Sequence, residues 1–182
     1  MVDYFRKLNK NFNIGEYDVK GVQMSYGEKT PEGFFGIEYC FVEFENKDDV
    51  MNIIPKEYQK YFFMTIMRIN REIPPHTDSG IKSTINFYIQ TDDCITQFYK
   101  FKTDKPKLYQ VENQSNGFLF DECDLDKVDS FVAKPTEAWV LDVTKPHSVM
   151  PQSTFNKRLA IAISSELEYG VVCDILKDGG YL

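Results

Sequence analysis

The segment Arg158-Leu-Ala-Ile-Ala-Ile-Ser164 points to the fold class, because its side chains alternate between two kinds. In a strand, successive side chains point to opposite faces. One face would carry Leu159, Ile161 and Ile163, and the other Arg158, Ala160, Ala162 and Ser164. A solvated face usually carries longer polar side chains, whereas small ones beside an arginine leave room for a ligand. Solvent exposure of the polar face stays open, but we favour a pocket.

A second segment, Ser83–Thr91, has the same two-faced character. Ile85, Phe87 and Ile89 alternate with a more polar set: Thr84, Asn86, Tyr88 and Gln90. The aliphatic and aromatic face is expected to pack against helices or a second sheet. The polar face is expected to look into the same pocket as the Arg158 strand.

From residue 63 onward, short β-like runs separated by turn residues dominate the chain. We expect strands over about 63–70, 83–91, 95–102, 108–112, 131–134, 137–143 and 158–166, and an earlier one over 38–44. Helices are expected over 2–12, over 47–53 after a possible N-cap at Asn46, and over 57–62. This pattern predicts a mainly β protein, a double-sheet sandwich or jelly roll with a few flanking N-terminal helices.

Composition restricts the function classes. The chain has 182 residues, of which 42% are hydrophobic, which fits one domain, 1–182, with a substantial core. Its net charge of −7 argues against nucleic-acid binding driven by phosphate neutralisation. The four cysteines form no C-x-x-C pair and the N-terminus is not signal-like, so we expect reduced thiols and a cytoplasmic location. No apolar run approaches the ~20 residues that span a bilayer.

The chain contains only two histidines. One lies in Pro75-His76-Thr77-Asp78, and the other is His147, which follows a proline. In an extended segment His76 and Asp78 point to the same side, so they can hold one metal ion together. Two imidazoles and one carboxylate form the facial triad of non-haem iron(II) oxygenases, which leaves coordination positions open. Arg158 follows His147 and could anchor an organic acid.

Each of these residues also has a plain structural interpretation. His76 and Asp78 could belong to a surface turn before Ser79-Gly80. Arg158 could form a surface ion pair, which contributes about 0–1 kcal/mol. The tryptophan Trp139 fits a core position better than a substrate platform. The aromatic residues Phe98, Tyr99 and Phe101 could line the pocket mouth or simply pack in a strand.

Four motifs together resemble the iron(II)/2-oxoglutarate-dependent oxygenases. They are Ile73-Pro-Pro-His76-Thr-Asp78, Ile85-Asn-Phe-Tyr88, Val140-Leu-Asp-Val-Thr-Lys-Pro-His147-Ser-Val149 and Arg158-Leu-Ala-Ile-Ala-Ile-Ser164. The last two look like the branch of aspartyl/asparaginyl and prolyl hydroxylases, including small phage and microbial forms. The resemblance covers about residues 63–166, which would form a double-stranded β-helix, the jelly roll also called cupin-like.

The resemblance implies roles for particular residues. His76, Asp78 and His147 would bind Fe(II), and Arg158 would bind the C5 carboxylate of the co-substrate 2-oxoglutarate. The implied reaction converts 2-oxoglutarate and O2 to succinate and CO2 and hydroxylates a substrate. One departure concerns position 160, where many relatives have a Ser or Thr that shares the carboxylate and this chain has Ala160. Other polar side chains could substitute, with Asn86 favoured over Thr84 and Ser164.

Three functions remain open from the sequence. The leading hypothesis is a small hydroxylase acting on a peptide side chain or an amino-acid-like small molecule, with neither nucleic acid nor membrane as a partner. A jelly-roll module that binds a ligand without catalysis and keeps a vestigial metal site is the main alternative. A cupin-like metalloenzyme that needs no 2-oxo acid is the third, and Arg158 would have no role in it.

Overall fold

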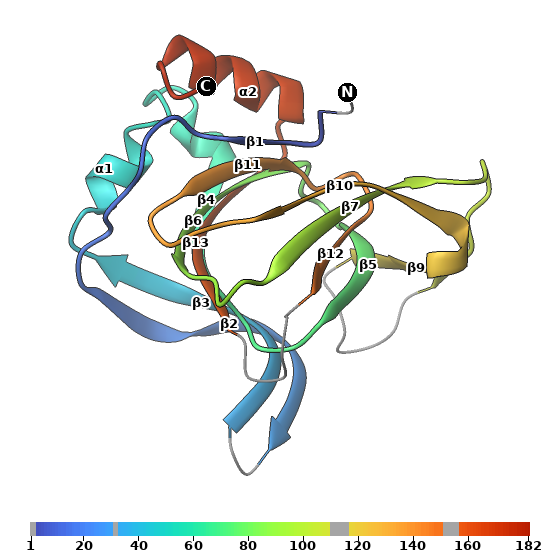
Figure 1. Cartoon of the computed structure of the whole chain (residues 1–182). Coiled ribbons are helices and arrows are strands. Elements are labelled where there is room, and N and C mark those ends of the chain that lie inside the picture. Colours follow the sequence, from blue (N-terminus) through green and yellow to red (C-terminus); the bar gives the residue numbers. More distant parts are fainter. Residues whose placement is uncertain (1–2, 31–32, 110–116, 151–156) are drawn as a thin grey trace.

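The computed structural model describes residues 3–30, 33–109, 117–150 and 157–182. Two antiparallel sheets face each other (Figure 1). The larger sheet has the order β1 (Phe5–Lys7), β11 (Ala138–Asp142), β6 (Ser83–Gln90), β13 (Arg158–Ser165), β4 (Phe62–Ile69), β3 (Gly33–Phe44) and β2 (Tyr17–Thr30). The smaller sheet has the order β10 (Leu125–Val132), β7 (Ile95–Phe101), β12 (His147–Met150), β5 (Ile73–Asp78), β9 (Gly117–Phe120) and β8 (Leu108–Tyr109).

The order of the strands makes this a jelly roll. Along the chain, β4, β6, β11 and β13 lie in the larger sheet, while β5, β7, β10 and β12 lie in the smaller one. The chain therefore passes back and forth between the sheets, and each group of four pairs in the order β11-β6-β13-β4 or β10-β7-β12-β5. This is the double-stranded β-helix expected from the sequence, and the protein is mainly β.

Two apolar layers follow from the two-faced strands. Ile85, Phe87 and Ile161 lie in the outer layer, between the larger sheet and the helices. Ala160 and Ala162 lie in the inner layer, between the two sheets. The helices α1 (Lys47–Met51) and α2 (Tyr169–Asp178) lie together on the outer side (Figure 1). Short 3-10 turns span Gln59–Tyr61 and Glu122–Asp124. No helix of the described residues has the length and apolarity to cross a bilayer.

Five expected strands of the roll agree with the structure to within one residue at each end: 63–70, 83–91, 95–102, 137–143 and 158–166. The strand expected over 131–134 instead begins at Leu125, and that expected over 38–44 begins at Gly33. Of the run 108–112, only Leu108–Tyr109 is a described strand, and 110–112 lie outside the described residues. The helix expected over 47–53 is α1.

Two helix predictions were wrong. Within 2–12, where a helix was expected, the described residues include the strand β1, which pairs with β11. Its Phe5 ring packs against Phe131 and Phe98, with ring centroids 4.8 and 5.3 Å apart, so tertiary contacts outweigh local helical preference. The helix expected over 57–62 is only a 3-10 turn before β4. Four further elements, β2, β9, β12 and α2, were not expected from the sequence.

Candidate metal and anion site

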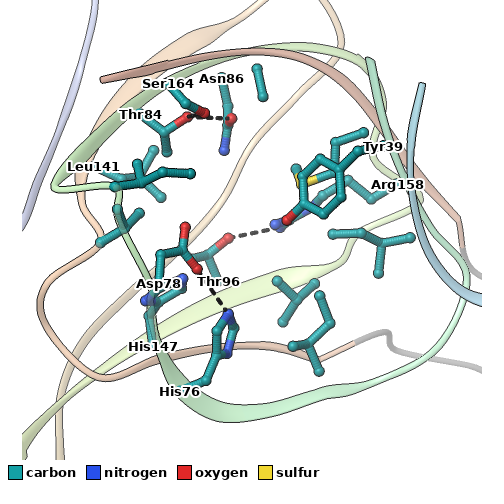
Figure 2. Close-up of a pocket in the computed structure, with 17 residues that line it drawn as sticks. Tyr39, His76, Asp78, Thr84, Asn86, Thr96, Leu141, His147, Arg158 and Ser164 are labelled. Carbon is teal, nitrogen blue, oxygen red and sulfur yellow. Dashed lines mark hydrogen bonds and ion pairs between the residues drawn. The ribbon is translucent and has the colours of Figure 1, made fainter. Parts of the chain in front are cut away.

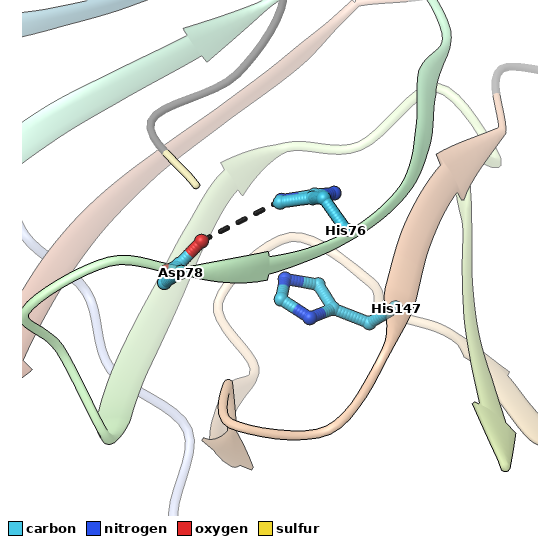
Figure 3. A group of neighbouring side chains, drawn as sticks. All are labelled: His76, Asp78 and His147. Atoms are coloured by element: carbon cyan, nitrogen blue, oxygen red, sulfur yellow. Dashed lines mark ion pairs between the residues drawn. The ribbon is translucent and has the colours of Figure 1, made fainter. Parts of the chain in front are cut away.

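The two histidines and Asp78 meet on neighbouring strands of the smaller sheet. His76 and Asp78 point to the same side of β5, and β12 places His147 directly opposite His76 in the antiparallel register. The two imidazole centroids are 4.3 Å apart, and one ligand atom from each of the three residues lies within 4.8 Å of the others. Figure 3 shows the three side chains converging from the two strands. Gly117 of β9 lies opposite Asp78, where a Cβ would clash with the carbonyl of Thr77.

Both imidazole rings are held in the tautomer that a metal ligand needs. The Nδ1 atom of His76 lies 2.8 Å from the carbonyl oxygen of Pro74, and Nδ1 of His147 lies 3.0 Å from that of Lys145. A carbonyl oxygen can only accept, so Nδ1 carries the proton in both rings. The lone pair is then on Nε2, which is free to bind a metal, and the backbone fixes the ring orientation.

The protonation states also suit a metal ion. Burial and the neighbouring His76 lower the pKa of His147 to about 4, so its ring is neutral near pH 7. Burial raises the pKa of Asp78, but the neighbouring His76 and His147 more than offset this effect and hold the pKa below its usual value. The His76 Nε2 to Asp78 Oδ1 distance is 3.5 Å. Two imidazoles and a carboxylate on one side of a cavity match the ligand set of an iron(II) facial triad.

Arg158 lies in the same cavity and is 2% exposed. Its Nη2 donates to the hydroxyl of Thr96 at 2.7 Å and to the carbonyl of Cys94 at 3.2 Å, and the guanidinium lies 5.2 Å from the Tyr88 ring centroid. Among the described residues, its Nε has no hydrogen-bond partner and no Asp or Glu forms an ion pair with it. A buried charge without a counter-ion is costly, which makes this a suitable site for an anion.

The polar residues expected to assist Arg158 form a separate cluster. The Thr84 hydroxyl lies 3.4 Å from Asn86 Oδ1 and 3.4 Å from the Ser164 hydroxyl. Figure 2 shows these three side chains at one end of the cavity and Arg158 beside Tyr39 at another. The side chain that Arg158 does contact is Thr96. No pattern in the sequence indicates this contact, because Thr96 lies on β7, far from Arg158 in the chain.

The cavity itself lies between the sheets and is small. All seven proposed site residues line it: His76, Asp78, Thr84, Asn86, His147, Arg158 and Ser164. Its remaining walls are mostly aliphatic, and its volume is about 50 Å³. That is room for roughly one or two water molecules. A ligand the size of a dicarboxylic acid would need wall side chains to move.

The aromatic residues considered from the sequence have mixed positions. Trp139 is partly buried and stacks on Phe131 at 4.1 Å, away from the residues that line the cavity. Phe98 is fully buried and stacks on the His147 ring at 5.6 Å, so it supports a proposed ligand. Tyr99 is buried and its hydroxyl lies 2.9 Å from that of Ser148, whereas Phe101 is exposed. None of these four side chains lines the cavity.

No protein-family model and no curated protein matches the sequence. Among solved structures, the chain is similar to vicilin from Corylus avellana (hazelnut), with 11% identity over 79% of this chain and a TM-score of 0.42. It spans about a third of that protein, 31% of its chain. A cupin-like protein from Thermotoga maritima gives 11% identity, 81% coverage of this chain, 84% of that chain and a TM-score of 0.36. The jelly-roll assignment itself rests on the strand order.

Proposed function

We propose that this protein is an iron(II)- and 2-oxoglutarate-dependent dioxygenase that hydroxylates a peptide side chain or an amino-acid-like substrate. The observation that carries the proposal is the buried guanidinium of Arg158, which has no carboxylate counter-ion among the described residues and lies in the same cavity as the three metal-ligand candidates. A metal site alone does not require a buried cation nearby. A co-substrate that chelates the metal through its 2-oxo acid end and has a carboxylate at its other end does require a cation, which binds that carboxylate.

The residues have distinct tasks in this proposal. His76, Asp78 and His147 would hold the iron, which with 2-oxoglutarate and O2 supplies the oxidising power for C–H hydroxylation. Arg158 would bind the distal carboxylate through charge-assisted hydrogen bonds, and Thr96 would keep its guanidinium in place. The aliphatic walls would exclude water from the reacting centre. Thr84, Asn86 and Ser164 would then contact substrate or co-substrate at the other end of the cavity.

The direct test is succinate formation from 2-oxoglutarate with Fe(II) and ascorbate, measured without an added substrate. We expect wild type to form succinate and both Asp78→Ala and Arg158→Ala to lose most of this activity.

Free thiols support the proposal of a cytoplasmic location, since none of the four cysteines is in a disulfide. The proposed partners are small molecules or peptides, with neither nucleic acid nor membrane.

A second candidate is a cupin-like metal site that uses no 2-oxo acid. It is favoured by one observation, the cavity volume of about 50 Å³, which suits a metal ion with water better than a dicarboxylic acid. In that case metal binds but 2-oxoglutarate does not, and no succinate forms under any condition. A jelly-roll binding module with a vestigial site would bind neither metal nor 2-oxoglutarate tightly.

A further inference from the structure

A second, larger hollow adjoins the cavity. It is lined by Met24, Tyr26, Tyr39, Phe63, Ile81 and Ser164 with small polar residues between them, and has a volume of about 400 Å³. We call it the neutral groove. Tyr39, Ile81 and Ser164 also line the cavity that holds the histidines and Asp78, so these three side chains separate the two spaces. Figure 2 shows two of them at different ends of the cavity, Ser164 beside Thr84 and Tyr39 beside Arg158.

The groove crosses the sheet to its edge. Apart from residues 79–81 of the loop after β5, its lining residues come from β13, β4, β3 and β2. These are consecutive strands of the larger sheet, and β2 is the outermost of them in the described part of the chain. With about 4.8 Å between neighbouring strands, three spacings give a length of about 14 Å. That length exceeds one amino-acid side chain and suits a side chain together with its flanking backbone.

The groove carries no charge. Of the described residues that line it, none is Asp, Glu, Lys, Arg or His, although 27% of the chain is charged. Two other hollows that share residues with the cavity differ: the lining of one includes Lys82 and Glu166, and that of the other includes Arg68, Lys157 and Glu38. An ammonium or carboxylate group placed in the neutral groove would lose water without gaining a counter-ion, which is unfavourable.

The lining instead suits a neutral amide and an apolar side chain. Met24 and Phe63 are 41% and 47% exposed, so they offer apolar surface that a ligand would cover. Gln23, Thr65 and Ser79 in the lining offer an amide and two hydroxyls that can hydrogen-bond to peptide N–H and C=O groups. The edge strand β2 adds backbone groups of the kind to which extended peptides bind.

We propose that the neutral groove binds an internal residue of a polypeptide that has an uncharged, apolar side chain, in preference to the free amino acid. A free amino acid has both an α-ammonium and an α-carboxylate group, and the groove neutralises neither. Naming the occupant a substrate rests on the proposed function. The binding itself does not, because it needs neither iron turnover nor 2-oxoglutarate.

Methionine methyl groups provide separate reporters for the two spaces. Met24 lines the groove, Met67 lines the cavity, and Met51 packs in the outer core. In ¹³C-methyl-methionine NMR of the zinc-loaded protein, titration with N-acetyl-leucine amide and N-acetyl-phenylalanine amide should shift the Met24 signal and leave Met51 unchanged. Free leucine and free phenylalanine should bind at least tenfold more weakly.

Two phenylalanines give a matched pair of variants. Phe63 in the groove and Phe118 in the hollow lined by Lys82 and Glu166 are 47% and 42% exposed, so Glu at either site should be tolerated by the fold. Phe63→Glu should weaken binding of the capped amino acids at least tenfold. Phe118→Glu should change it less than twofold.

Several results would overturn the inference. Equal or tighter binding of the free amino acids would show that charge is not excluded. Loss of binding in Phe118→Glu but not in Phe63→Glu would place the binding site for the capped amino acids in the charged hollow lined by Lys82 and Glu166. The absence of a Met24 shift with all capped amino acids at saturating concentration would remove the groove as a peptide site. If the proposed function is wrong but the groove binds peptides, the Met24 signal should still shift and only succinate formation should be missing.

Discussion

At the scale of single residues, Arg158 is the most informative side chain of the site. We expect Arg158→Ala to weaken 2-oxoglutarate binding to the Mn(II)-loaded protein by roughly 30- to several-thousand-fold, because losing one side of a buried charge-assisted pair costs about 2–5 kcal/mol. Arg158→Lys keeps the charge but loses the planar fork, so its affinity should be intermediate. Anaerobic calorimetric titration measures both. Unchanged affinity in Arg158→Ala would place the anchor elsewhere, and Mn(II) affinity serves as the control.

Thr96 gives a second prediction, for a positioning residue that sequence reasoning missed. Its hydroxyl accepts from Arg158 Nη2 at 2.7 Å and its side chain is 1% exposed. Thr96→Val keeps the side-chain shape but removes the hydrogen bond to the guanidinium. A hydrogen bond to a charged group contributes about 1.5–3 kcal/mol. We expect 2-oxoglutarate to bind about tenfold more weakly. In the Arg158→Ala background the same change should add little, and a full additive loss would argue against positioning through Arg158.

These residues also show how much of the site the sequence could predict. The i, i+2 spacing of His76 and Asp78 and the rarity of histidine were enough to select the metal-ligand candidates, and all meet in one cavity. The sequence could not identify Thr96, because contact with Arg158 depends on how β7 faces β13 across the two sheets. Nor could it separate the Thr84, Asn86 and Ser164 cluster from Arg158, since alternation gives the face of a strand but not the position along the cavity.

At the scale of elements, the two faces of β6 predict opposite effects of truncation. Phe87 is 1% exposed in the outer core, so Phe87→Ala should lower the free energy of unfolding by about 3–5 kcal/mol. Asn86 faces the cavity, and its hydrogen bonds are long, 3.4 and 3.5 Å. We therefore expect Asn86→Ala to lower the free energy of unfolding by much less than Phe87→Ala does. Urea denaturation of both variants measures the two losses in the free energy of unfolding. A larger loss in Asn86→Ala would reverse the assignment of the faces.

The pairing of β1 with β11 gives a pH prediction. Glu137 accepts from Lys7 Nζ at 2.5 Å, from the Lys134 backbone N–H at 3.0 Å and from Trp139 Nε1 at 3.1 Å. Burial alone would raise its pKa, but these bonds hold the pKa below the usual value of 4.5. Its contribution to stability is therefore present above pH 4.5 and lost as the pH falls through the lower, folded-state pKa.

The stability difference between wild type and Glu137→Gln should accordingly shrink as the pH is lowered from 7 to below 4.5, as measured by urea denaturation. In a Lys7→Ala background the shrinkage should be smaller, because the largest favourable partner is gone. A difference that is constant over this range would show that the bonds to Glu137 do not depend on its charge.

The elements also mark the limit of sequence-based prediction. Strands with strong alternation, such as β6 and β13, were found almost to the residue. The segment around Phe5 failed because its strand conformation depends on β11 and on rings that are distant in the chain. The strand β12 carries His147 but is only four residues long, too short for alternation to be recognised.

At the scale of the whole molecule, the site joins the two sheets. His76, Asp78 and His147 lie on the smaller sheet, whereas Arg158 lies on the larger one. Within the smaller sheet, β5 and β12 are neighbours although 70 residues lie between the two histidines in the chain, so a metal ion between them would connect distant parts of the chain. A ligand that also reached Arg158 would hold both layers, and its binding free energy would add to the stability of the roll.

This arrangement predicts that metal stabilises the fold and that Asp78 is required for it. A ligand at one hundred times its Kd stabilises the native state by about 2.7 kcal/mol. For a chain of this size that corresponds to a rise in Tm of roughly 5–10 °C. Wild type with Mn(II) should show this rise under anaerobic thermal denaturation, and Asp78→Ala should show little. Asp126→Ala removes a carboxylate that is 47% exposed, so it should respond to Mn(II) as wild type does. Equal Tm rises in Asp78→Ala and wild type would exclude Asp78 as a ligand, since the metal would then be binding at another place in the native fold.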